Sequence, residues 1–468
     1  MSRHWLFILI GMTLLWGGCS LAPDYTRPEA PVPGDWPTGA AYQDARSATG
    51  TPEGSGLPWR EFLADSRLQK VVEMAVASNR DLRLAALNVE KVRALYGVQR
   101  AALFPSVDAT GSMAKERVPA DLSSTGKSVI SEKDSVSLGI TSWEIDFFGR
   151  IRSLKDQALQ EYLATEQARR SAQISVVSEV AGAYLTLAAD RENLQLAEST
   201  LEAQQAAYVL IQKRYDVGLA TELDLRRAQT QVDAARGDVA RYTQLAAQDR
   251  NALNLLAGAQ VPEELLPEDL TSVTPPKDIS PGLSSEALLN RPDIMAAEHR
   301  LKGAYAYIGA ARAAFFPRIS LTTTVGTASA ELSGLFSSGS ATWSFVPKIT
   351  IPIFDARTWA ALRVSKAQRK IILTQYERAI QVAFREVADA LAVRGTVDQR
   401  VSAQQSLVDA VAETYRLSNK RYENGIDSYL SVLDAHRALY GAQQGLISLR
   451  LAKLAGHVRL YAVLGGGE

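Results

Sequence analysis

The sequence predicts a mixed α and β fold built from two tandem repeats, in which four strands per chain join a membrane barrel and long helices continue from them. Three observations favour this fold: a residue pattern that occurs twice, two pairs of alternating strands, and two long helical tracts without proline. The composition fits a folded protein, because 46% of the 468 residues are hydrophobic and 22% are charged. Basic and acidic residues number 51 each, which argues against a basic nucleic-acid groove.

The N-terminus has the pattern of an export signal. A short basic region precedes an apolar run over residues 5–16, and Gly17-Gly18-Cys19 follows as a small-residue cleavage site. The run is too short to span a bilayer. We therefore expect residues 1–18 to be a signal peptide and Cys19 to be the lipidated first residue of the mature chain, as in bacterial lipoproteins. An ordinary secretory signal with an incidental cysteine is the alternative.

The single cysteine and the residues after it limit the functions that the N-terminal part can have. Cys19 is the only cysteine, which excludes a disulfide within the chain and any cysteine cluster for zinc or iron-sulfur. Ser20, at the next position, is compatible with sorting to the outer membrane. Residues 19–65 include a stretch rich in proline and glycine that resists helix formation, so we expect a lipidated extended segment there.

The remainder of the chain contains the same unit twice. The pattern from Asp81 to Pro105 recurs from Asp293 to Pro317 at a constant offset of 212 residues, and a later pattern around Gly218 recurs around Gly425 at an offset of 207. Chance similarity between alanine-rich helices could mimic part of this, but not a shared order of helix, Phe-Pro break, hairpin and turn. We expect a first repeat over 66–257, an inter-repeat linker in the equatorial region over 258–283 and a second repeat over 284–468.

Each repeat begins with a helix and continues into a β-hairpin. Helices over 66–103 and 284–315 should end at Phe-Pro, since proline lacks an amide donor and disfavours helical geometry in the preceding residue. Alternation with a period of two then predicts hairpins over 104–148 and 316–354. The positions on one face are Val107, Ala109, Gly111, Met113, Val136, Leu138, Ile140, Ile319, Leu321, Thr323, Val325, Trp343, Phe345, Ile349, Ile351 and Ile353.

The four strands have no second sheet to cover this face. A half-buried sheet in a soluble sandwich would show the same alternation, but no other part of the sequence has a strand pattern. Lipid could cover the face instead. A sheet in a membrane cannot leave an open edge, and four strands are too few to close a barrel with a lumen. The sequence therefore predicts that several chains build one barrel.

Long helical hairpins follow the β-hairpins. No proline occurs from 150 to 217 or from 356 to 423, and apolar residues recur there at three-four spacing, which is typical of coiled-coil packing. Gly218 and Gly425 should turn the chain into return helices over about 221–256 and 428–464. A structural coiled coil without a conduit is the alternative that periodicity alone leaves open.

The other motifs in the sequence do not indicate a functional site. Gly126-Lys127-Ser128 looks like the end of a phosphate-binding loop, but Asp121 stands where the loop's first glycine should be. The four histidines have no metal-ligand spacing, and most carboxylates alternate with Lys and Arg along helices. We therefore expect no metal site, no cofactor and no enzyme activity.

Several motifs spread along the chain belong together: Pro23-Asp24-Tyr25, Trp143 to Arg150, Asn290 to Ile294, Ala314 to Pro317, Pro352 to Asp355 and Arg421 to Gly425. With these motifs the sequence resembles the TolC-like outer-membrane factors of tripartite efflux systems, in particular the lipidated branch associated with resistance-nodulation-division pumps. The resemblance covers essentially the whole mature chain. One departure from the family pattern is Ala356, which stands where the family has a glycine in the second Phe-Asp-Gly turn.

The resemblance implies a homotrimer with a twelve-stranded outer-membrane barrel, continuous with a twelve-helix barrel in the periplasm. It implies that the protein is the exit duct of a tripartite drug efflux pump and works with a periplasmic adaptor and an inner-membrane resistance-nodulation-division pump, in contact with outer-membrane lipid and without nucleic acid. An outlet for type I protein secretion is the closest alternative. A periplasmic coiled-coil scaffold is an alternative of another class, and the cargo is left open.

The resemblance also assigns residues near the two helical turns. Gly218 and Gly425 mark turns that would contact the adaptor. A periplasmic aperture would involve Leu430 and Asp434, four positions apart on one helix face, and Arg437. An ordinary surface pair between Asp434 and Arg437 is the alternative. The complete set of predicted aperture residues is Tyr422, Asp427, Leu430, Asp434 and Arg437.

Overall fold

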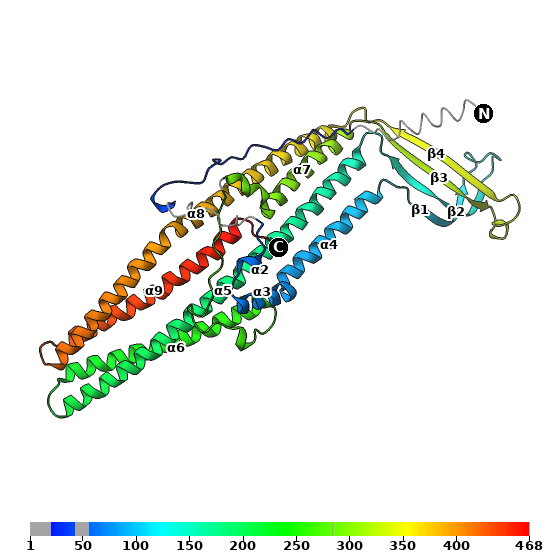
Figure 1. Cartoon of the computed structure of the whole chain (residues 1–468). Helices are drawn as coiled ribbons and strands as arrows, with labels where there is room; N and C mark the ends of the chain where they lie inside the picture. Colours follow the sequence, from blue (N-terminus) through cyan, green and yellow to red (C-terminus); the bar gives the residue numbers. More distant parts are fainter. Residues whose placement is uncertain (1–19, 43–55, 283, 468) are drawn as a thin grey trace. The chain divides into compact units, whose positions relative to one another are not determined.

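The computed structural model describes residues 20–42, 56–282 and 284–467 (Figure 1). The predicted signal peptide and Cys19 lie outside the described residues. The chain divides into two compact units. Unit 1 contains described residues 20–28, 89–165 and 296–376, and unit 2 contains the remaining described residues.

Unit 1 contains an antiparallel sheet with strand order β1-β2-β3-β4. The strands are β1 (Val107–Val118), β2 (Val129–Ile145), β3 (Arg318–Ser329) and β4 (Ala341–Thr350). The β1-β2 hairpin comes from the first repeat and the β3-β4 hairpin from the second, and β2 pairs with β3 to join them. Within the described residues, β1 and β4 each pair on one side only. The sheet therefore has two open edges.

The register places the predicted apolar positions on one face. Ala109 pairs with Leu138, Leu138 pairs with Val325, and Val325 pairs with Trp343. Directly paired residues project from the same side of a sheet, so these four side chains form a row across all strands. Much of this face is open, and Trp343 is 80% exposed. The opposite face is polar, as the 2.7 Å contact between the hydroxyls of Thr324 and Ser344 illustrates.

A β-bulge keeps the apolar face continuous. Ile140 pairs with Thr323, but the next paired residue on β2 is Trp143, opposite Leu321. The extra residue lies at a position where Ser142 has a φ of 60°, a left-handed conformation that is uncommon outside glycine. Because of the bulge, the apolar residues switch from even to odd numbers without leaving their face.

The helix predicted over 66–103 is divided in two. Helix α3 (Ser66–Ser78) ends before Asn79, and α4 (Arg80–Ala101) follows immediately. Asn79 has an extended backbone, and its side-chain oxygen accepts hydrogen bonds from the amides of Asp81 and Leu82 at 2.9 and 3.0 Å. Asparagine is a strong helix N-cap, so it begins a new helix within an otherwise helical pattern.

The second repeat shows a comparable interruption. A 3-10 helix, η4 (Ser285–Asn290), precedes α7 (Pro292–Ala313), and Arg291 between them is extended. Proline disfavours helical geometry in the residue before it and is well tolerated at the first helical position. The single helix predicted over 284–315 is therefore wrong at its N-terminal end, and Pro292 supplies the physical reason.

Four long helices form the helical hairpins. Helix α5 (Arg150–Asp216) is followed by α6 (Glu222–Ala257), and α8 (Ala356–Glu423) by α9 (Tyr429–Val463). Helix α5 includes an 18-residue window apolar enough to cross a membrane by composition, but half of that window is buried inside the fold. Packing between helices accounts for its apolar character. The remaining short elements are η1 (Ala40–Tyr42), α2 (Trp59–Phe62), η3 (Glu263–Leu265) and η5 (Leu332–Gly334).

The two strand-to-helix junctions differ in backbone conformation at the residue that precedes or begins the helix. Gly149, before α5, has a φ of 72° and needs the left-handed region. Ala356, the corresponding residue, begins α8 and does not have a positive φ. The carboxylate of Asp355 accepts a hydrogen bond from the amide of Arg357 at 3.0 Å at this helix start. The second junction therefore accommodates alanine where the first junction has glycine.

Candidate functional site

The two helical hairpins of unit 2 turn through the same backbone motif. Gly425 has a φ of 71° and donates its amide to the carbonyl of Tyr422, while the amide of Ile426 donates to the carbonyl of Arg421, both at 2.9 Å. Gly218 has a φ of 76° and makes the equivalent pair of bonds. This is the Schellman motif, in which a left-handed glycine satisfies the last carbonyls of a helix.

The side chains that secure the turns differ between the repeats. In the first turn, Thr221 and Asp224 form a capping box at the start of α6. In the second turn, Ser428 makes no side-chain cap bond. Asp427 instead forms a bidentate ion pair with Arg421, with contacts of 2.6 and 3.0 Å. The hydrogen bonds from this guanidinium lower the pKa of the Asp427 carboxyl below its ordinary value.

Aromatic and apolar contacts join the two turns. The guanidinium of Arg214, on α5, lies 5.0 Å from the ring centre of Tyr422, which is cation-π distance. The ring of Tyr422 lies 5.3 Å from that of Tyr429. Both rings pack at a cluster to which the two hairpins contribute, so the hairpins meet through a shared core. The buried members of this cluster are Ile211, Leu225, Ala228, Tyr429, Val432 and Leu433.

The other three predicted aperture residues lie on α9. The side chains of Asp434 and Arg437 are 64% and 60% exposed, and their closest charged atoms are 3.8 Å apart. This distance is longer than a hydrogen bond. Arg437 also donates from Nε to Oε1 of Gln231 at 3.4 Å, and Leu430 is 40% exposed. The five residues thus fall into two groups. Tyr422 and Asp427 are held at the turn by the contacts described above, whereas Leu430, Asp434 and Arg437 lie on an accessible face of α9.

Residues outside the predicted set also shape this site. The ring of His436 packs edge-on against Tyr415 with centroids 5.2 Å apart, and its Nδ1 lies 3.0 Å from Nε2 of Gln204. Burial lowers the pKa of His436. The sequence carried a usable signal only for Arg214 of the first turn, because Arg214-Tyr215 and Arg421-Tyr422 are equivalent in the two repeats.

Comparison with known proteins identifies the family to which this architecture belongs. The family described as "Outer membrane efflux protein" matches residues 71–259 and 283–466. The probable efflux pump outer membrane protein TtgC of Pseudomonas putida is 47% identical over all of this chain and 96% of its own length. The outer membrane protein OprJ of Pseudomonas aeruginosa is 42% identical over 98% of this chain and 95% of its own length.

Solved structures agree with this relationship. The open state of the Neisseria gonorrhoeae MtrE outer membrane channel has a TM-score of 0.85 and 36% identity, covering 96% of this chain and 98% of that one. A membrane protein from Pseudomonas aeruginosa has a TM-score of 0.89 and 40% identity, covering 96% of this chain and 100% of that one.

The sheet with one exposed apolar face and the paired helical hairpins define a channel-forming protein of the bacterial outer membrane. This chain belongs to the outer membrane efflux protein family, whose members include the TolC-like factors that its motifs resemble. The predicted fold class, the outer-membrane localisation with a periplasmic helical part, and the efflux-channel function are thereby confirmed.

Proposed function

We propose that three copies of this chain form the passive exit duct of a tripartite drug efflux pump. The observation that carries the proposal is the four-stranded sheet, which has an exposed apolar face and two unpaired edges in the described residues. Such a sheet is stable in a bilayer only when its edges are closed by other strands. Three copies supply twelve strands. Passive passage through such a duct requires no bond chemistry, cofactor or metal.

Exposed apolar stripes on the helices support closure by further copies. Helix α4 exposes Leu84 and Leu87, and α8 exposes Val364, Ile371, Val382 and Val393. The spacing of three residues on α4, and the spacings of seven and eleven residues on α8, place each stripe along one side of its helix. In a closed ring of helices, these stripes would pack against neighbouring chains, which explains why they are uncovered in one chain.

The second helical turn is the proposed periplasmic aperture. Around a threefold axis, Leu430 and Asp434 would each form a ring, one apolar and one acidic, a single helical turn apart. Arg437 is close enough to Asp434 to reduce repulsion among three carboxylates. The ion pair between Arg421 and Asp427 would hold the turn that carries these rings.

The partners follow from the family and from the exposed turns. The turns at Gly218 and Gly425 would contact a periplasmic adaptor, which would connect the duct to an inner-membrane resistance-nodulation-division pump. Cys19 would carry the lipid anchor. Substitution of Cys19 by Ala should abolish acyl labelling of the mature protein while leaving barrel insertion intact, since acyl chains add little to the anchoring of a barrel.

The decisive test is drug accumulation in a deletion strain. Loss of this gene should raise the intracellular level of pump substrates, and complementation should restore the original level. Native mass spectrometry of the purified complex should give three chains. Unchanged drug accumulation together with loss of a secreted polypeptide would instead favour an outlet for type I secretion, and a folded monomer extractable without detergent would favour a periplasmic scaffold.

A further inference from the structure

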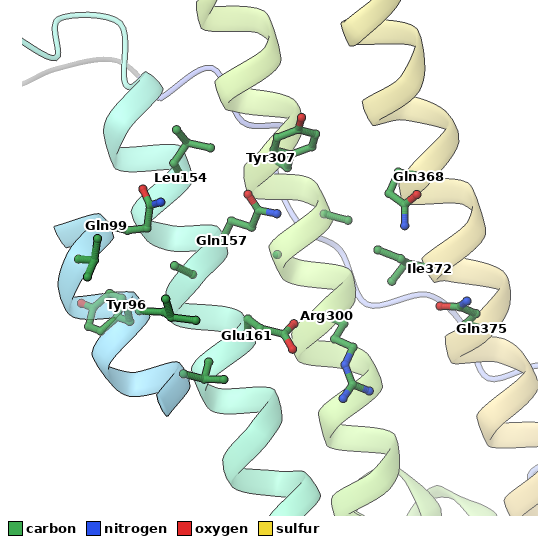
Figure 2. Close-up of a pocket in the computed structure, with 16 residues that line it drawn as sticks. Tyr96, Gln99, Leu154, Gln157, Glu161, Arg300, Tyr307, Gln368, Ile372 and Gln375 are labelled. Carbon is green, nitrogen blue, oxygen red and sulfur yellow. The ribbon is translucent and has the colours of Figure 1, made fainter. Parts of the chain in front are cut away.

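A cavity in unit 1 lies on a wall made by four helices (Figure 2). Helices α4, α5, α7 and α8 lie side by side, and the cavity has a volume of about 770 Å³. This volume is typical of a site for a drug-sized molecule. At the floor, a Cβ on Gly303 of α7 would lie in ordinary van der Waals contact with the side chain of Gln160 and the backbone of Gln157, at 3.5 and 3.6 Å, so α7 and α5 are close neighbours there.

The cavity opens on the opposite face of α7 from the N-terminal segment. The segment contacts α7 through Tyr25, whose ring lies 5.5 Å from that of Tyr305, and through Arg27, which is paired with Glu298. Arg300 and Tyr307 lie two positions beyond Glu298 and Tyr305, which is about 200° around a helix. The chain's own N-terminal segment therefore covers one face of the wall and leaves the cavity face open.

The lining is mostly apolar, with four glutamines along it and two charged residues at one end. Leu95, Tyr96 and Ile372 supply apolar surface, and Tyr96 is held by stacking on Tyr162 with centroids 6.4 Å apart. Glu161 and Arg300 lie beside each other at one end in Figure 2. Both are exposed, and neither forms an ion pair with another described residue.

The distribution of charge selects a class of ligand. From Arg300 to Tyr307 the helix advances by about 10 Å, enough for a molecule of two or three fused rings. A simple cation would be attracted by Glu161 and repelled by Arg300, and an anion would experience the reverse. A head group with both charges satisfies both side chains at once. The cavity therefore favours a zwitterion with a flat apolar body.

We infer that this cavity, lined by Tyr96, Glu161, Arg300, Tyr307 and Ile372, is a binding site for amphipathic zwitterions with an aromatic body. That exported molecules bind transiently at this site on the wall of the duct rests on the proposed export function, whereas the binding itself does not. Exposed apolar surface in a water-filled passage gives weak and reversible binding, which is what transport requires.

Fluorescence anisotropy with matched xanthene dyes tests the inference. The full-length protein in lipid nanodiscs is titrated against rhodamine B, a zwitterion, and rhodamine B ethyl ester, its cationic counterpart, with empty nanodiscs subtracted. We expect rhodamine B to bind at least fivefold more tightly than its ethyl ester. The double substitution Glu161→Gln with Arg300→Gln should remove this preference, and Ile372→Ser should weaken both dyes at least threefold.

The controls distinguish binding at the cavity from the export function of the duct. Asp156→Asn removes an exposed charge from α5 outside the cavity and should leave both affinities unchanged. Native mass spectrometry identifies variants that still assemble. Equal affinities of the two dyes for the wild type, or a charge preference that survives in an assembled double variant, would overturn the inference. Drug accumulation in the deletion strain tests the export function separately, so the two proposals fail through different measurements.

Discussion

The guanidinium of Arg27 lies 2.7 Å from the carboxylate of Glu298, and this contact secures the N-terminal segment to α7. Glu298 is 4% exposed and also accepts hydrogen bonds from Tyr25 at 3.0 Å, while Lys302 approaches it at 2.9 Å. Burial opposes ionisation of Glu298, but the hydrogen bonds from Arg27, Lys302 and Tyr25 outweigh it and lower its pKa. One buried carboxylate thus holds three side chains in place.

We expect Glu298→Gln to release the segment and to destabilise the protein by about 1–3 kcal/mol, since it leaves charged groups without their partner. Limited proteolysis should cut the N-terminal segment faster, and the melting temperature should fall. Because the pKa of Glu298 is lowered by folding, the stabilisation is present at neutral pH and is lost as the pH falls through the folded-state pKa. Asp24→Asn, an exposed carboxylate of the same segment, is the control and should change neither measurement.

A second pH effect has the opposite sign. Burial, together with the charge of Asp190 and a hydrogen bond to it, raises the pKa of Asp249 to about 6. Asp190 itself has a raised pKa because of burial. The two groups, one on α5 and one on α6, titrate as a pair. A carboxyl whose folded-state pKa is raised favours the folded state at low pH, and that advantage disappears as the pH rises through 6.

Protonation of this pair should therefore raise the melting temperature of the wild-type protein when the pH is lowered from 7.5 to 5. Asp249→Asn should raise the melting temperature at pH 7.5 by about 2–4 °C and should reduce the gain on acidification. Asp233→Asn, at an exposed position of α6, is the matched control. A variant that keeps the full wild-type pH dependence would show that the pair does not limit stability.

The apolar sheet face gives a third prediction with a control in the next residue. Leu138→Arg places a charge on the face that carries Trp343 and should lower the yield of assembled trimer, at a cost of about 2–4 kcal/mol near the bilayer midplane. Ser137→Arg points to the polar face and should be tolerated much better. Comparable yields for the two variants, quantified by native mass spectrometry after extraction, would contradict a lipid-facing role for Leu138.

Local periodicity was enough to predict the strands, the long helices and the glycine turns, because each depends on residues close in sequence. The division of the first helix at Asn79 was missed, since asparagine occurs both within helices and at their ends. The bulge before Trp143 left a readable signal, a change from even to odd apolar positions. The contact between Arg214 and Tyr422 could not be predicted, because it joins residues of different repeats through packing.

The last prediction concerns the proposed aperture. The substitution Asp434→Ala with Arg437→Ala removes the acidic ring and its counter-charge, and we expect it to raise single-channel conductance in planar bilayers by about twofold or more. Leu430→Ala should widen the adjacent apolar ring and act in the same direction. Because three carboxylates attract cations, the wild type should prefer cations, and this preference should fall with rising salt. Asp409→Ala, at an exposed site on α8, is the control. Wild-type conductance and selectivity in the double variant would mean that Asp434 and Arg437 form an ordinary surface pair, as their 3.8 Å separation in one chain also allows.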